Sequence, residues 1–134
     1  MIKDLPENEV KDIGIAVVLD EEFVEEKSWK VYLINFKKVE ITHVLVSSKG
    51  YGSYKGEEVK TSVLRHSLGN LGPSSYVLIE PIQESLFSLT NEFLLSFYIG
   101  ETIYDKKFVF VTESVVESNF IRIPLVNKPG VMIA

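Results

Sequence analysis

Apolar and polar residues alternate along much of the chain with a period of two, the spacing that places successive side chains on opposite faces of a β-strand. In the segment 31–36, Tyr32, Ile34 and Phe36 share one side, and the segment 93–99 alternates in the same way. Both segments are rich in β-branched and aromatic residues, which fit a pleated and half-buried surface. The pattern therefore predicts strands rather than helices.

The same reading predicts about eight strands in all. Besides 31–36 and 93–99, strands are expected at 13–19, 40–47, 59–66, 76–82, 108–112 and 120–125. Many short strands at close spacing are typical of an antiparallel sandwich or barrel. The sequence shows no linker, internal repeat or low-complexity tract. We therefore expect an all-β protein, a single-domain antiparallel β-sandwich that spans residues 1–134.

Turn residues support this division in two places. The segment 36–39 is expected to close a tight hairpin between two strands, and Gly100 stands first in a two-residue turn of type II′. The segment 61–69 is open to two interpretations. Leu64 and Leu68 have the four-residue spacing of a short helix, whereas β-branched residues at every second position favour a strand. We favour the strand.

The first two predicted strands carry a further likeness. Ile13-Gly14-Ile15, followed by Trp29 on the second strand, resembles immunoglobulin-like sandwiches in general architecture. The chain contains no cysteine, so the disulfide pair that would flank the tryptophan is absent. The resemblance implies a layered β architecture with a buried Trp29, and no particular function.

Composition is that of an ordinary folded domain. The 134 residues are 46% hydrophobic and 25% charged, enough to form one continuous core. No apolar run approaches the roughly 20 residues that a membrane-spanning helix requires. The first ten residues lack the basic start and apolar centre of an export signal. We expect a cytoplasmic location and no membrane contact.

Charge is unevenly distributed along the chain. The net charge of −5 divides into −6 over residues 1–27, +4 over 28–66 and −3 over 67–134. An acidic protein is a poor candidate for nucleic-acid binding, because that affinity comes mostly from neutralising phosphate charge. The basic middle segment could still attract an anion or an acidic partner.

The region Ser47–His66 combines glycines with aromatic and basic side chains, which suits recognition of a peptide, an anion or a single-stranded base. Its candidate binding residues are Lys49, Tyr51, Tyr54, Lys55, Arg65 and His66. The glycine spacing GxGxxxG matches neither a P-loop nor a dinucleotide-binding loop. We expect 49–56 to form an exposed loop that carries contacts but no chemistry, and Arg65 to form an internal ion pair with Glu80.

Catalytic and metal-binding patterns find little support. The histidines are His43 and His66, and neither occurs in an HxH or HExxH pattern. Ser62 lies near His66 without the GxSxG motif of a nucleophile elbow. We therefore expect no enzyme activity, no metal site and no cofactor.

Three functions remain open at this stage. The first is a non-catalytic interaction or structural module, which binds a protein partner or forms a homo-oligomer through the Ser47–His66 region. The second is an accessory protein linked to RNA or tRNA that uses residues 28–66 as a basic face. The third is a small-ligand or weak enzymatic role in a pocket between the sheets. The first is favoured.

Overall fold

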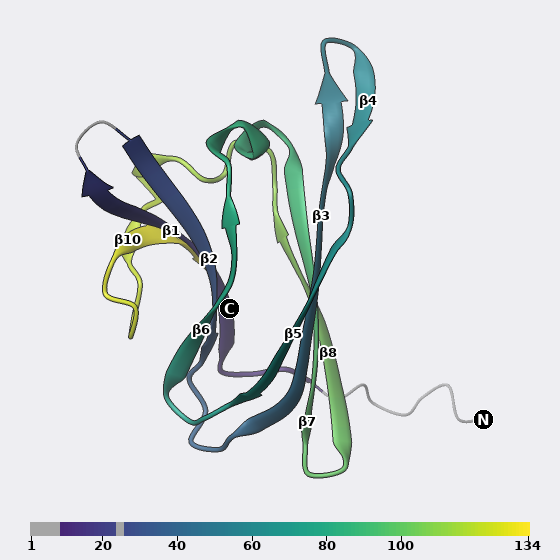
Figure 1. The fold of residues 1–134 in the computed structure, drawn as a ribbon, viewed down its shortest axis with the longest axis vertical. Helices are drawn as coiled ribbons and strands as arrows, with labels where there is room; N and C mark the ends of the chain where they lie inside the picture. Colours follow the sequence, from purple (N-terminus) through teal and green to yellow (C-terminus); the bar gives the residue numbers. More distant parts are fainter. Residues whose placement is uncertain (1–8, 24–25) are drawn as a thin grey trace.

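The computed structural model describes residues 9–23 and 26–134. The first ten residues, from which the absence of an export signal was predicted, lie largely outside this range. So does part of the acidic segment 1–27. In the described part of the chain, strands and short turns form two antiparallel sheets packed face to face (Figure 1). The prediction of an all-β sandwich is confirmed.

The two sheets have five strands each. Sheet A has the order β6 (Ser75–Ile82), β2 (Glu26–Asn35), β1 (Ile13–Phe23), β10 (Pro129–Ile133) and β9 (Ile121–Arg122). Sheet B has the order β4 (Glu57–Lys60), β3 (Ile41–Tyr54), β7 (Thr90–Ile99) and β8 (Thr102–Phe110), with β5 (Leu64–Leu71) also paired to β3. Among the described residues, the connections contain two short 3₁₀ helices, η2 (Glu84–Ser88) and η3 (Glu117–Asn119).

The main core lies between the sheets and follows from the alternation along the strands. Residues such as Ile15 and Val17 on β1, and Phe93 and Phe97 on β7, point inward and are fully buried. Trp29 is 6% exposed and meets the ring of Phe87 edge to face, with ring centres 4.9 Å apart. The predicted burial of Trp29 is confirmed.

A second, smaller core lies on the outer face of sheet A. The segment 121–128 folds back over this face and buries Ile123 and Val126 against Ala16, Val18 and Ile34. The outward side of β1 is therefore apolar, which explains why nearly every residue from Ile13 to Leu19 is hydrophobic. A strand buried on both faces loses the alternation that identifies half-buried strands.

An ion pair closes the edge of this second core. The carboxylate of buried Asp20 accepts hydrogen bonds from Lys128 (2.5 Å) and Lys30 (2.7 Å). The bond from Lys128, followed by that from Lys30, holds the pKa of Asp20 below its usual value, and the same carboxylate raises the pKa of Lys128. The pair joins β1 and β2 to the chain segment just before β10.

Three predicted features of the strands differ from the structure. The expected strand at 59–66 is two strands, β4 and β5, separated by an irregular stretch at 61–63, and β10 was not predicted at all. The segment 36–39 is not a hairpin, because β2 and β3 belong to different sheets and the chain crosses from sheet A to sheet B here. The buried Asn35 side chain holds this connection: its amide donates hydrogen bonds to the carbonyls of Val39 and Gly72. The turn at Gly100 joins β7 to β8 as predicted, with φ +60° at the glycine.

Candidate functional site

The predicted loop at 49–56 is a β-hairpin. Strand β3 continues without a break to Tyr54, reverses at Lys55 and Gly56, and returns as β4. Both turn residues have positive φ, 52° and 80°, as a type I′ turn requires. In Figure 1 this hairpin extends beyond the body of the sandwich. The tip is exposed, as expected, but residues 49–54 are strand residues rather than a loop, and Gly50 and Gly52 lie within β3.

Those strand glycines have a packing role. A Cβ at Gly50 would lie 3.1 Å from Cγ2 of Thr61, and one at Gly52 would lie 3.2 Å from Cδ2 of Leu89. Both distances are tighter than ordinary side-chain contacts, so a Cβ at either position would force the neighbouring side chain to shift. The glycines serve close packing against neighbouring segments, and only Gly56 serves the turn.

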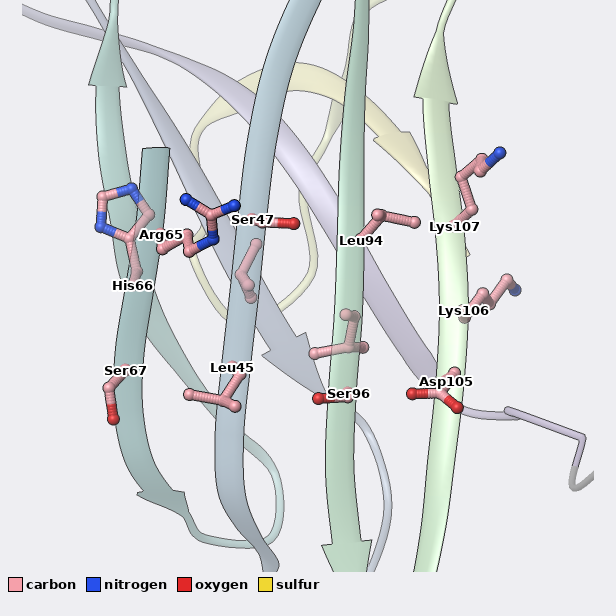
Figure 2. Close-up of a pocket in the computed structure, with 12 residues that line it drawn as sticks. Leu45, Ser47, Arg65, His66, Ser67, Leu94, Ser96, Asp105, Lys106 and Lys107 are labelled. Atoms are coloured by element: carbon pink, nitrogen blue, oxygen red, sulfur yellow. The ribbon is translucent and has the colours of Figure 1, made fainter. Parts of the chain in front are cut away.

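Arg65 and His66 are neighbours on β5 and so point to opposite faces of sheet B. Figure 2 shows Arg65 extended toward Ser47, with His66 on the other side of the strand. On that inner side, Nε2 of His66 lies 3.0 Å from Oε1 of Glu80. The predicted ion pair between Arg65 and Glu80 is therefore wrong, since His66 occupies the place expected for Arg65.

The reason is an irregularity in β6. Its pairing with β2 shifts by one residue between Val31 and Tyr32, so Ile79 and Glu80 are both buried although they are adjacent. A β-bulge of this kind redirects one side chain relative to the alternating pattern. It brings Glu80 to the inner side of β5, where an even-numbered residue such as His66 can meet it.

Glu80 also accepts a hydrogen bond from the hydroxyl of buried Ser48, at 2.5 Å. The arrangement Ser48–Glu80–His66 has the residue types of a serine hydrolase triad but not its order, because the hydroxyl donates to the carboxylate and not to the imidazole. The trio links the edge of sheet A to β3 and β5 of sheet B. No three His, Cys, Asp or Glu side chains come close enough to bind a metal ion within 9–23 and 26–134.

The outer face of sheet B is open and carries a shallow groove of about 760 Å³ across β5, β3, β7 and β8. The groove consists of two rows of side chains that run across the strands, and each strand contributes one residue to each row (Figure 2). The upper row is Arg65, Ser47, Leu94 and Lys107; the lower row is Ser67, Leu45, Ser96 and Asp105. We call this surface the sheet B groove.

The floor of the groove is apolar at two positions. Leu45 is 51% exposed and Leu94 is 44% exposed, and they are diagonal neighbours because Leu45 pairs with Ser96 and Ser47 pairs with Leu94. Diagonal side chains on adjacent strands lie about 7–8 Å apart. In each row the two central positions are therefore one leucine and one serine, and the two leucines lie diagonally opposite each other.

Cations outnumber carboxylates along the upper row and above it. Lys49 and Lys107 share one carboxylate, that of Glu92, at 3.4 Å and 3.6 Å. Tyr51 covers the same carboxylate, with its hydroxyl 3.5 Å away. No ion pair reaches Arg65 from any residue that the structure describes. The guanidinium is exposed and faces the groove.

The six predicted binding residues therefore divide. Lys49, Tyr51 and Arg65 lie on the outer face of sheet B, Lys55 lies at the hairpin tip, and His66 faces inward. Tyr54 ends β3, and its side chain is outside what the structure describes. The sequence reasoning missed Leu45, Leu94 and Lys107, whose adjacency depends on which strands pair and in which register.

The cations of the basic segment 28–66 do not share one face. Lys30 lies on sheet A and bonds Asp20, Lys37 and Lys38 lie in the crossing after β2, and Lys49 and Arg65 lie on sheet B. A continuous basic stripe of the kind that follows a phosphate backbone is therefore not formed by this segment.

Comparison with known proteins adds no relative: no family model matches the chain, and no curated protein matches it. No helix in the described part of the chain is long and apolar enough to span a membrane.

Proposed function

We propose that this protein is a non-catalytic interaction module and that the sheet B groove is its contact surface for a protein partner. The observation that carries the proposal is the pair of exposed leucines, Leu45 and Leu94, at the centre of the groove beside an arginine that has no ion pair among the described residues. Arginine is enriched in protein interfaces, and the buried centre of an interface is more apolar than the rest of the surface. The rigid sheet holds these groups in place before any partner arrives.

The alternatives have less support. A small-ligand or catalytic role would be favoured by a pocket shared by Arg65, His66 and Glu80, but Arg65 and Glu80 lie on opposite sides of sheet B. A role in RNA binding would be favoured by a single basic face, whereas the cations of 28–66 are divided between sheets. Interaction with a protein requires neither arrangement.

Site-specific photo-crosslinking in the native cells tests the proposal. A benzoylphenylalanine at Ser96, in the groove floor, is compared with one at Tyr76, an exposed residue of β6 in the other sheet. We expect a discrete crosslinked protein from position 96 only, and loss of that product when Leu94→Asp is added. Equal products from both positions, or a product that survives Leu94→Asp, would contradict the proposal.

A further inference from the structure

The groove geometry also indicates what kind of segment it accepts. This inference rests on the proposed function and specifies the partner. We propose that the sheet B groove binds an extended acidic segment that crosses the strands, with carboxylates at positions i and i+4 and an aliphatic side chain at i+2. The occupant is part of another protein, and its recognition depends on the upper row from Arg65 to Lys107.

The spacing of the charges fixes the carboxylate positions. Arg65 and Lys107 stand at opposite ends of one row that spans four neighbouring strands. Strands lie about 4.8 Å apart, so three steps separate these two residues by roughly 14 Å. Along an extended chain, residues i and i+4 point to the same side and lie about 13 Å apart. One acidic residue can therefore face each cation at the same time.

The floor between the cations selects the residue at i+2. That side chain falls midway along the row, over Leu94 and its diagonal neighbour Leu45. A branched aliphatic group there would cover both leucines and remove apolar surface from water. The apolar floor is narrow, whereas a docked helix presents an apolar stripe at least 100° wide, so an extended segment fits this surface better.

The serines supply what an extended segment needs and a helix does not. An extended backbone arrives with unpaired N–H and C=O groups. Ser47, Ser67 and Ser96 line the groove, and within the described residues none of their hydroxyls is used in a hydrogen bond. Each hydroxyl can donate and accept, so the floor offers partners in both roles.

The charges of the two rows determine that the bound segment is acidic and that it lies on the upper row. Lys49 and Lys107 share the single carboxylate of Glu92, and Arg65 has no carboxylate partner in the described chain, which leaves the upper row positive. Asp105 ends the lower row and would repel an acidic group placed there. An acidic segment is therefore directed to the upper row, in a protein whose overall charge of −5 otherwise disfavours anions.

NMR titration with synthetic peptides tests this inference. The probe is GSESLSESG, which carries glutamate, leucine and glutamate at i, i+2 and i+4. Its controls are GSQSLSQSG, without charge, and GSESLESSG, of identical composition but with one glutamate on the opposite side. We expect the probe to shift amides of the upper row with a Kd near or below about 1 mM, and to bind about fivefold more tightly than either control.

Protein variants test the residues. Arg65→Gln and Lys107→Gln should each weaken probe binding about fivefold, and added salt should weaken it further, because exposed ion pairs are screened. Lys38→Gln, which removes one exposed lysine outside the groove, should leave it unchanged. Equal affinity for the three peptides, no saturation by about 5 mM, or preference for a single-stranded oligonucleotide over the probe would overturn the inference. If crosslinking from position 96 succeeds while the probe fails, the proposed function stands and only the partner assignment is lost.

Discussion

Asp20→Asn tests how strongly the ion pair on sheet A holds the segment 121–128 in place. The side chain is buried and accepts bonds from Lys30 and Lys128 at 2.7 Å and 2.5 Å. A hydrogen bond to a charged group contributes about 1.5–3 kcal/mol. Both lysines are partly exposed and regain water when released, and asparagine can still accept one bond, so we expect a net loss of about 2 kcal/mol. With an unfolding entropy of roughly 0.28 kcal/mol/K for this chain length, the melting temperature falls by about 7 °C.

The pH dependence of stability separates the loss of the Asp20 charge from any change in side-chain packing caused by Asp20→Asn. The pKa of Asp20 is lowered from 3.8 in the folded state, so its contribution is present above pH 4 and disappears as pH falls further. The pKa of Lys128 is raised from 10.5, so its contribution is present below that pH and is lost only as pH rises past it. Urea unfolding of wild type and Asp20→Asn should differ most between about pH 5 and 9, and the difference should shrink as the pH falls below 3.8.

Asp105→Asn provides the matched control. Asp105 is an exposed aspartate on β8 with no ion pair among the described residues, so its loss should change stability by less than about 0.5 kcal/mol. A loss of stability for Asp20→Asn that persists undiminished at pH 2 would refute the electrostatic reasoning. So would a loss no larger than that of the control at pH 7.

Three further outcomes are expected. Trp29→Ala should cost about 3–5 kcal/mol in urea unfolding, and wild-type emission should be blue-shifted and move red on unfolding; a cost below 1 kcal/mol would contradict the observed burial. Lys106 points to the inner side of edge strand β8, with its ammonium 5.0 Å from the ring centre of Phe108. Because an inward charge opposes edge pairing, Lys106→Val should self-associate in sedimentation experiments at concentrations where wild type does not. Lys55→Asn should slow amide exchange across the β3–β4 hairpin, since asparagine tolerates a φ near +52° better than lysine does; unchanged exchange would count against this.

Strand alternation was sufficient to predict the fold class, because most strands are buried on one face only. It failed where a strand deviates from that condition. β10 contains Pro129 and Gly130, two residues that ordinarily mark turns, and no pattern in it indicates a strand. Gly130 is required there by its closeness to the backbone of β1, which no property of the sequence reveals.

The candidate site was only partly predictable for a related reason. Arg65, Lys49 and Tyr51 could be selected by residue type, and the structure places all three on one face. Their apolar companions, Leu45 and Leu94, look like ordinary core leucines in the sequence. Alternation within 93–99 separates Leu94 from Phe93 and Leu95, but only the register of β3 against β7 shows that Leu45 and Leu94 are neighbours on one face. The exchange of roles between Arg65 and His66 depends on the bulge before Glu80, which alternation cannot predict.

The pairing of the first strand with the last has a consequence for how the chain is made. β1 is completed on one side by β2, which follows it directly, but its other edge pairs with β10, from Ile15 opposite Ile133 to Val18 opposite Gly130. During synthesis, β1 leaves the ribosome more than a hundred residues before its second partner. For that interval an apolar edge remains open, and neither sheet A nor the small core beneath residues 121–128 can be completed. Final folding must therefore wait for translation to pass β10, and a nascent chain stalled before that point should depend on chaperones that bind exposed apolar strands.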